Sequence, residues 1–392
     1  MAVTDVTSLS ITKFQLGVQV TKVTDSSADW SSVANNTYFY DKGDQLVHYK
    51  NSGGTVLELF SASGGLTYFT EAENSSGVNS TIFVDSLTAA SSSTNADFAI
   101  LPKGTGAILA SVPNGLASGG NKRGSNSLDL QRVRSSATDV ASGTSSILLG
   151  LNSSVSGSYS TCIGNANVNS GDQAVNVGGL SNTVSAAYAS NFGGQINTAS
   201  GNWSTTLGGS SNTASSTYST TIGGNGNTAS GYGSYAMGRG SNTFTTRGRQ
   251  SRGQFMFVTG DCQKSEFFLG ARTTDPTTTT LTTNGDADLT TAQIILANNS
   301  SYRFKGTIIG KQSLSTNTAA WDIDGIIVRG TSAATTSIVL SNINLVSNSP
   351  AWGTPLLTAD TTNGALRVQV IGYQATNIQW TCIVETTEVI YA

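Results

Sequence analysis

The sequence predicts an all-β protein built around a central β-solenoid, and three observations lead to this prediction. A segment of about fifteen residues repeats through the middle of the chain, as in STTLGGSSNTAS at 204–215 and STTIGGNGNTAS at 219–230. Glycine is abundant, with 44 residues among 392, whereas charged residues make up 11% of the chain. Residues 247–392 contain longer runs rich in β-branched and aromatic residues, which are typical of strands.

The composition favours short strands and tight turns over disorder. Disordered chains usually combine high charge or abundant proline with few apolar residues. Here there are 5 prolines, and 37% of the residues are hydrophobic. Many of these are single Val, Ile or Leu residues between small polar ones, as expected for short strands.

The repeat runs from Ala141 to Phe244 in seven copies whose lengths differ by at most one residue. One column of the aligned copies is an unbroken series of glycines: Gly150, Gly164, Gly178, Gly193, Gly208, Gly223 and Gly238. An apolar residue precedes each glycine: Leu149, Ile163, Val177, Phe192, Leu207, Ile222 and Met237. An asparagine column follows in the later copies: Asn182, Asn197, Asn212, Asn227 and Asn242.

Each repeat can form one coil of a β-solenoid, with two short strands joined by turns. Glycine takes the backbone angles that a corner needs. Asparagine tolerates left-handed angles and bonds its neighbours' backbone. Coils stack at roughly 4.8 Å, so seven would rise about 33 Å. A flexible Gly/Ser/Asn linker is the alternative, but a linker has no need for an apolar residue at every corner.

A single coil of this sequence has a poor core. It offers one sizeable apolar residue at the glycine corner and a small one near Ala214 or Ala229. A solenoid this thin is expected to bury a second face against another surface. The simplest partner is another copy of the chain, arranged with cyclic symmetry about the long axis.

The pattern SGxxSTxIGGxxNTA resembles the head repeats of trimeric autotransporter adhesins and similar repeats in phage fibres. The resemblance covers about a quarter of the chain and implies a left-handed β-roll, three of which pack around a threefold axis. The sequence departs from the bacterial adhesins because we find no signal peptide, no sustained heptad stalk and no terminal membrane anchor. These differences favour the viral version, a homotrimeric fibre.

The segments before the repeats are expected to dock on the virus particle and to connect that end of the chain to the repeats. GGNKRGSNSLDLQRVRSSATDVASG at 119–143 and NADFAILPKGTGAIL at 95–109 resemble elements of phage tail-fibre proteins. Read from its residues, SLDLQRVRSS forms a short helix or strand that packs Leu128, Leu130 and Val133 at the axis. Further upstream, YFYD, QLVHYK and TVLELF form a hairpin-like series separated by Gly-containing turns.

The segment after the repeats contains eight strand-like runs, which predict a β-sandwich or a jelly roll. Most of the last third of the chain resembles a C-terminal domain of phage tail-fibre and virion proteins. We therefore expect five segments: a particle-attachment segment at 1–40, an N-terminal β region at 41–118, a connector at 119–140, the β-roll at 141–246 and the C-terminal β-domain at 247–392.

Few residues are suited to catalysis or metal binding. The single histidine, His48, has no second histidine to join it, and no nucleophile elbow or phosphate-binding loop is present. Two carboxylate pairs, Asp286 with Asp288 and Asp322 with Asp324, could serve glycosidic acid/base chemistry or hold a cation. Turn and solvent-face aspartates are far commoner, so we predict no catalytic residue, no metal and no cofactor.

Aromatic side chains are the best candidates for ligand contact, since they can stack on sugars from a rigid β-scaffold. Trp352, in the loop SNSPAWGTP, is the best exposed candidate, together with Tyr302 and Tyr373. Trp321 and Trp380 lie in strand-like runs and are expected in the core. In the roll, one column forms an aromatic ladder: Tyr159, Tyr188, Trp203 and Tyr218.

The resemblance implies a structural virion fibre, here a phage tail fibre. Its N-terminal region is expected to dock on other virion proteins, and its distal C-terminal domain to attach to a host surface glycan or protein by multivalent, non-catalytic binding. The alternatives are a capsid or tail decoration fibre without a receptor role, a polysaccharide depolymerase, and a bacterial surface adhesin. The lack of an export signal weighs against the adhesin.

Charge and cysteine content narrow the partners and the location. A net charge of −3 gives no reason to expect nucleic-acid binding, and no run approaches the ~20 apolar residues of a membrane helix. The 3 scattered cysteines do not form a disulfide framework, which favours synthesis in a reducing host cytoplasm. The expected location is the virion, on the phage tail or the capsid surface.

Overall fold

The structure is a computed structural model that describes residues 22–24, 27–42, 46–58, 69–74, 84–89, 95, 99–257, 261–286, 289–349 and 351–391. The chain divides into two compact units, Met1–Leu101 and Pro102–Ala392. In these described ranges the regular structure is β-strand, apart from two short 3₁₀ helices at Ser27–Ser32 and Ala333–Thr335. The predicted all-β class is confirmed.

The first unit contains the predicted hairpin series. Strands β1 (Lys22–Thr24), β2 (Thr37–Asp41), β3 (Leu46–Lys50) and β4 (Val56–Glu58) form one sheet, and β5 (Phe69–Asn74) pairs with β6 (Val84–Ala89). His48 is buried on β3, where its ring stacks on Phe39. Residues 1–21 of the expected attachment segment lie outside the described residues.

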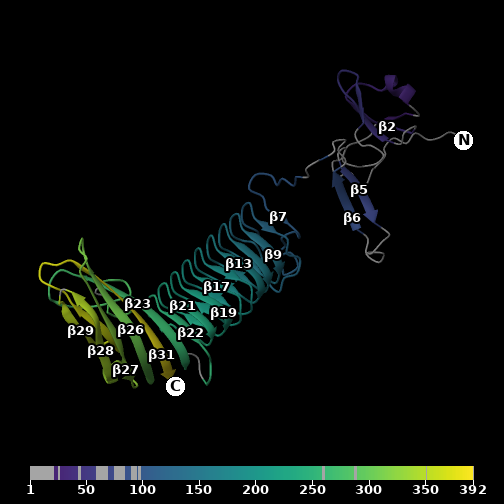
Figure 1. Cartoon of the computed structure of the whole chain (residues 1–392). Helices are drawn as coiled ribbons and strands as arrows, with labels where there is room; N and C mark the ends of the chain where they lie inside the picture. The colour runs from purple at the N-terminus through teal and green to yellow at the C-terminus, as the bar shows by residue number, and fades with distance from the viewer. Residues whose placement is uncertain are drawn as a thin grey trace. The chain divides into compact units, whose positions relative to one another are not determined.

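The second unit begins with a β-solenoid of about eight turns, as predicted (Figure 1). Its coils pair in parallel along two ladders. The first ladder contains β7 (Ile108–Leu109), β8 (Leu128–Asp129), β9 (Ile147–Leu151), β11 (Thr161–Asn165), β13 (Val175–Leu180), β15 (Ser190–Phe192), β17 (Thr205–Leu207), β19 (Thr220–Asn225), β21 (Tyr235–Arg239) and β22 (Gln250–Gly253). The second contains β10 (Ser154–Val155), β12 (Val168–Asn169), β14 (Thr183–Val184), β16 (Thr198–Ala199), β18 (Thr213–Ala214) and β20 (Thr228–Ala229).

The first ladder starts before the recognisable repeats, because β8 in the expected connector pairs with β9. Leu130 is exposed on the single chain, whereas Asp129 is buried at the level of this coil. The Asp129 carboxylate accepts from Arg123 Nε at 2.7 Å and from Arg134 at 3.3 Å. The buried cluster of Asp129, Arg123 and Arg134 therefore occupies the interior at this coil.

The interior of the coils corrects one expectation from the sequence. The apolar residues before the glycines point outward: Phe192, Leu207 and Ile222 are 50%, 42% and 41% exposed. Strand alternation turns their neighbours inward instead. The buried interior columns are Leu148, Cys162, Asn176, Asn191, Thr206, Thr221 and Ala236 on the first ladder and Val155, Asn169, Val184, Ala199, Ala214 and Ala229 on the second. The small residue expected near Ala214 and Ala229 is therefore confirmed, whereas the large residue before each glycine lies outside the interior columns.

The asparagine column confirms the expected bonding to neighbouring backbone, whereas the left-handed angle belongs to the residue before each asparagine. Asn182, Asn197, Asn212 and Asn227 are fully buried, and the residue before each of them takes the left-handed angle, as Ser211 does with φ 57°. Each backbone N–H donates at 2.9 Å to the Oδ1 of the asparagine one coil earlier. Asn242 stands outside this ladder and instead accepts from the N–H of Phe244 at 2.8 Å.

The glycine corner yields a testable difference between two neighbours. Gly208 and Gly209 both have positive φ, at 66° and 78°. A Cβ on Gly208 meets nothing closer than 3.7 Å, whereas one on Gly209 lies 2.2 Å from the carbonyl oxygen of Gly224 in the next coil. We expect Gly208→Ala to cost about 1–2 kcal/mol of unfolding free energy, and Gly209→Ala about 1–3 kcal/mol more. Urea unfolding of both variants checks this, and equal losses contradict it.

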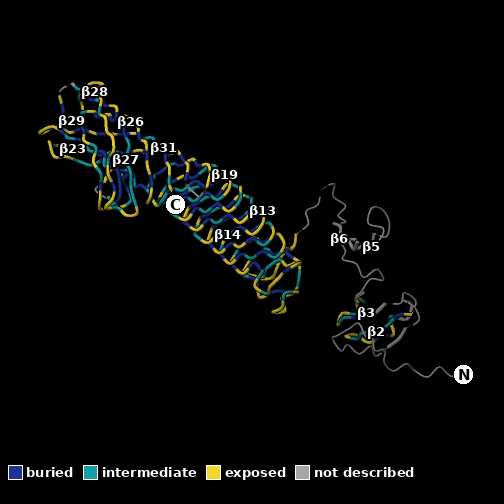
Figure 2. The backbone as a smooth tube through the Cα atoms, turned by 90° about the horizontal axis from the view of Figure 1, so that it is seen from below, coloured by how far each residue is buried: buried dark blue, intermediate teal, exposed yellow. Residues whose placement is uncertain are grey.

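The C-terminal strands continue the first ladder of the solenoid. After β22 the order is β23 (Cys262–Thr273), β31 (Ile378–Ile390), β26 (Ser300–Gln312), β27 (Thr318–Arg329) and β28 (Ser337–Ser349), all antiparallel. A second sheet contains β24 (Thr278–Thr280), β30 (Ala365–Ile371), β25 (Ile294–Ile295) and β29 (Gly353–Asp360). Buried residues of both sheets form one hydrophobic core. Buried stretches of the C-terminal strands are dark blue in Figure 2.

A buried ion pair joins the last coil to the C-terminal sheets. Arg249, the residue before β22, donates to the carboxylate of Glu388 on β31, and both side chains are fully buried. Arg249 Nε also donates to Ser251 and Ser265 at 3.1 and 3.0 Å. Gln263 donates to Glu388 at 2.7 Å. Polar groups of the solenoid and of β23 therefore converge on one carboxylate of β31.

Candidate functional site: a cationic pocket at the ends of β23, β26 and β31

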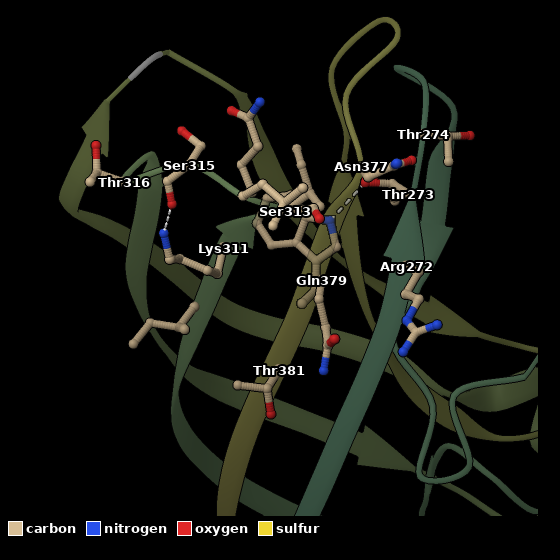
Figure 3. A pocket seen from close by; sticks show the side chains of 15 residues that line it. Arg272, Thr273, Thr274, Lys311, Ser313, Ser315, Thr316, Asn377, Gln379 and Thr381 are labelled. Carbon is tan, nitrogen blue, oxygen red and sulfur yellow. Dashed lines mark hydrogen bonds between the residues drawn. The ribbon is translucent and has the colours of Figure 1, made fainter.

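A pocket of about 1170 Å³ opens on the C-terminal domain where β23 and β26 end and β31 begins (Figure 3). The loop after β26 and the residues before β31 form its remaining wall. Glu388 lies toward the opposite end of β31, and the strand between Gln379 and Glu388 spans about 30 Å. The pocket is thus remote from the junction with the solenoid.

Three side chains form a row across the pocket. Arg272 on β23 and Lys311 on β26 both pair in register with Gln379 on the central strand β31. All three occupy outward positions of their strands, and Figure 3 shows the two cations on opposite sides of the Gln379 amide. Two strand spacings separate Arg272 from Lys311, roughly 10 Å between their Cα atoms.

The charge of this row is not compensated within the pocket. No aspartate or glutamate is among the residues that line it. In the described part of the chain, the Arg272 guanidinium has no ion pair or hydrogen bond. Lys311 Nζ donates to the backbone carbonyl of Ser315 (Figure 3). Asp275, just beyond the lining, turns its carboxylate to the N–H of Thr277 at 2.8 Å.

The pocket combines this charge with neutral donors and apolar groups. Asn377, Ser313 and Thr274 contribute amide and hydroxyl groups to the wall. Trp380 also borders the pocket but is buried, and its Nε1 donates to Thr273 Oγ1 at 2.9 Å, which fixes the indole ring. Such a mixture of a few placed polar groups with apolar ones is typical of small-ligand sites.

The aromatic candidates from the sequence do not line this pocket. Trp352 is 4% exposed and packs edge-on against Trp380 with ring centroids 5.5 Å apart, so its expected exposure is wrong. Tyr302 is also buried; burial and the nearby Glu388 carboxylate raise its pKa to about 12. Tyr373 is 52% exposed, in the turn that leads to Asn377.

The candidate carboxylates are engaged elsewhere. Asp322 and Asp324 share the outer face of β27, as strand alternation requires. Asp322 accepts from Thr307 at 2.8 Å, and Asp324 accepts from Arg303 at 2.7 Å. Asp286 is exposed, and its partner Asp288 lies outside the described residues. Among the described residues, no group of three or more His, Cys, Asp or Glu side chains is placed to hold a metal ion.

Three of the four residues of the predicted aromatic ladder stack on the outside of the coils, whereas Gln173 occupies the position between Tyr159 and Tyr188. Tyr188, Trp203 and Tyr218 stack with ring centroids 5.1 and 5.2 Å apart. Each holds a positive φ between 54° and 60°, which normally favours glycine. Because the ring faces cover one another, this column offers ring edges rather than a flat surface to a ligand.

The outward apolar column of the solenoid is the other surface of interest. Phe192, Leu207 and Ile222 lie on three successive strands of one ladder and face solvent in the single chain. Isolated exposed apolar residues are ordinary, whereas a continuous row of them marks an interaction surface.

No protein-family model matches the sequence, and no curated protein matches it. A search of solved structures finds a weak similarity to the crystal structure of the Acinetobacter baumannii phage AM24 tailspike protein. The two chains share 7% sequence identity with a TM-score of 0.18, over 63% of this chain. This chain spans about half the length of that tailspike, 54% of it.

In the part of the chain that the structure describes, no helix is long and apolar enough to cross a membrane.

Proposed function

We propose that the protein is a homotrimeric phage fibre that attaches to a host surface through its C-terminal β-domain without catalysing a reaction. The observation that carries this proposal is the apolar column on the outside of the solenoid. Its repeat also resembles those of trimeric adhesins and phage fibres. In this proposal the N-terminal unit docks on the particle, and the C-terminal domain, a β-sandwich, carries the contact with a host glycan or protein.

The position of the apolar residues supports the proposed trimer. Most interior positions of the coils hold small or polar residues, and the large residues before the glycines lie outside these interior columns. Burying an exposed apolar side chain yields about 1.5–3 kcal/mol, and the column repeats this gain at every coil. Three copies around one axis let each column face the others and close the assembly.

Binding is favoured over catalysis by the state of the carboxylates. The pair on β27 accepts hydrogen bonds from a threonine and an arginine and lies outside the pocket lining. Attachment needs no reactive group, because three copies in one fibre strengthen a weak contact through effective concentration.

The first experiment is light scattering on the full chain and on two variants. We expect a mass three times that of the 40.3 kDa chain. Leu207→Asp with Ile222→Asp places charges in the apolar column and should shift the mass toward the monomer. Asn202→Asp, on an exposed turn of the same coil as Leu207, should remain trimeric. A folded monomeric wild type contradicts the trimer.

The second experiment measures attachment of the fluorescently labelled full chain to a panel of bacterial strains. Saturable binding to some strains supports the attachment role. A trimer that binds no strain points to a decoration fibre instead. Release of reducing sugar from bacterial polysaccharide, abolished by Asp322→Asn with Asp324→Asn, points to a depolymerase and overturns the non-catalytic proposal.

A further inference from the structure

The outer face of the C-terminal sheet carries two sets of paired cations. They differ in whether a carboxylate of the protein lies between the two cations. Near the solenoid, Lys264 on β23 and Lys305 on β26 both reach Glu385 on β31, at 3.0 and 3.2 Å. The hydrogen bonds from these lysines hold the pKa of Glu385 below its usual range. This set is neutralised in part by its own central carboxylate.

The pocket carries a related arrangement on the same three strands. Arg272 on β23 and Lys311 on β26 both face the central strand in register, whereas in the set near the solenoid only Lys305 faces Glu385 directly and Lys264 lies two residues from Glu266, the β23 residue in register with Glu385. The central residue is Gln379, a neutral amide of nearly the same size as glutamate. The position filled by a protein carboxylate near the solenoid therefore lacks one at the pocket.

We propose that this pocket binds an acidic saccharide, and that the carboxylate of the sugar takes the place between Arg272 and Lys311. The proposal rests on the attachment function above and specifies the chemical class of its ligand. Uronic and sialic acids share the required carboxylate, and the test below separates them.

The contacts fit such a ligand. The arginine fork binds a carboxylate through two parallel N–H donors, and lysine adds a point charge. The Gln379 amide can donate to the same carboxylate or accept from a sugar hydroxyl. Ser313, Thr274 and Asn377 line the wall and can pair with further hydroxyls.

The size of the pocket favours an oligosaccharide over a small free anion. Its volume of about 1170 Å³ exceeds that needed for one monosaccharide. Ile309 and Leu314 are exposed in the lining and provide apolar area for the less polar faces of sugar rings. A free inorganic anion would use the charged row and leave the rest of the pocket without a role.

The test is calorimetric titration of the full chain with three acidic oligosaccharides: tetragalacturonic acid, a hyaluronan tetrasaccharide and an α2,8-linked sialic acid trimer. The methyl ester of each serves as its matched neutral ligand, because it keeps the sugar and removes the charge. We expect at least one acid to bind, and its ester to bind at least about tenfold more weakly. The identity of the acid that binds distinguishes uronic from sialic acids.

Gln379→Glu is the decisive variant. It restores within the pocket the carboxylate that the other set already has, so the protein should neutralise its own cations and lose affinity for the acid by about tenfold or more. Arg272→Gln and Lys311→Gln should each weaken binding as well. Gln254→Glu makes the same change of charge at an exposed position outside the pocket and should bind like the wild type.

Three results overturn the proposal: none of the acids binds, the ester binds as well as the acid, or Gln379→Glu binds like the wild type while its thermal unfolding is unchanged. The strain-binding assay separates this inference from the function on which it rests. If the labelled chain attaches to cells but calorimetry detects no binding of any of the three acids, the pocket assignment alone is overturned. Saccharide binding that depends on Gln379, without attachment to any strain, overturns the attachment function alone.

Discussion

Replacing Asn212 by aspartate is expected to lower the free energy of unfolding by about 3–5 kcal/mol. The Asn212 amide is fully buried, and its Nδ2 donates to the carbonyls of Gly208 and Gly224 at 3.1 and 3.3 Å. Its Oδ1 accepts the backbone N–H of Asn227 at 2.9 Å. A carboxylate keeps the acceptor, loses both donors and faces two carbonyl oxygens, so a buried charge is left without a cation to balance it.

The pH dependence of this loss gives a second, independent signature. Burial beside carbonyl oxygens raises the pKa of the introduced carboxyl in the folded state above the ordinary value of about 3.9. The unfolded chain then releases its proton first, so the destabilisation is smallest below about pH 4 and grows as the pH rises. Urea unfolding at pH 4 and pH 8 measures it. Asn202→Asp, at an exposed position of the solenoid, should lose less than about 0.5 kcal/mol at either pH. A loss that is equal at both pH values contradicts the ladder's role.

The second large effect is expected at the junction between the solenoid and the C-terminal sheets. Arg249→Met leaves the buried Glu388 carboxylate without its cation and should cost about 3–5 kcal/mol. Combining Arg249→Met with Glu388→Gln removes the charge from both sides, so the double variant should be more stable than the single one. Such a recovery is the mark of direct coupling between two side chains.

The exposed ion pair between Lys264 and Glu385 provides the matched control for the Arg249 and Glu388 variants. Lys264 also forms an ion pair with a β31 glutamate, at 3.0 Å, but its side chain is largely exposed. Lys264→Met should cost no more than about 1 kcal/mol, because solvent-exposed pairs contribute little. Equal losses for Arg249→Met and Lys264→Met in urea unfolding would show that burial of the junction pair does not determine its contribution.

The solenoid could be predicted because its signal is local and repeated. Each glycine corner and each strand lies within one repeat, and seven copies show the same columns. The direction in which the columns face was harder to predict. The alternation in a strand such as STTIG does not say which of its two faces is inside. Size favours the larger Ile222 for the interior, whereas the structure buries Thr221 and exposes Ile222. The hydrogen bonds of the interior asparagines, which link consecutive coils, decide in favour of small polar residues.

The pocket could not be predicted because its residues meet only through long-range strand pairing. Gln379 lies far along the chain from both Arg272 and Lys311, and no local pattern links the three positions. Trp352 illustrates the opposite problem. Its loop composition indicates exposure, yet Asn348 Oδ1 accepts the N–H of Trp352 at 2.8 Å and its ring packs against Trp380 in the core.

The parallel ladders of the solenoid imply that its length can change without altering the rest of the protein. Coils of slightly different length stand side by side, and an irregularity between Ile163 and Asn165 absorbs the difference in register. Each coil bonds mainly to the coils before and after it, as in other repeat proteins. Duplicating or deleting one whole repeat would therefore change the length by about 4.8 Å and leave both ends unaltered. The distance between the two ends of the solenoid can thus evolve in small equal steps, independently of what either end binds.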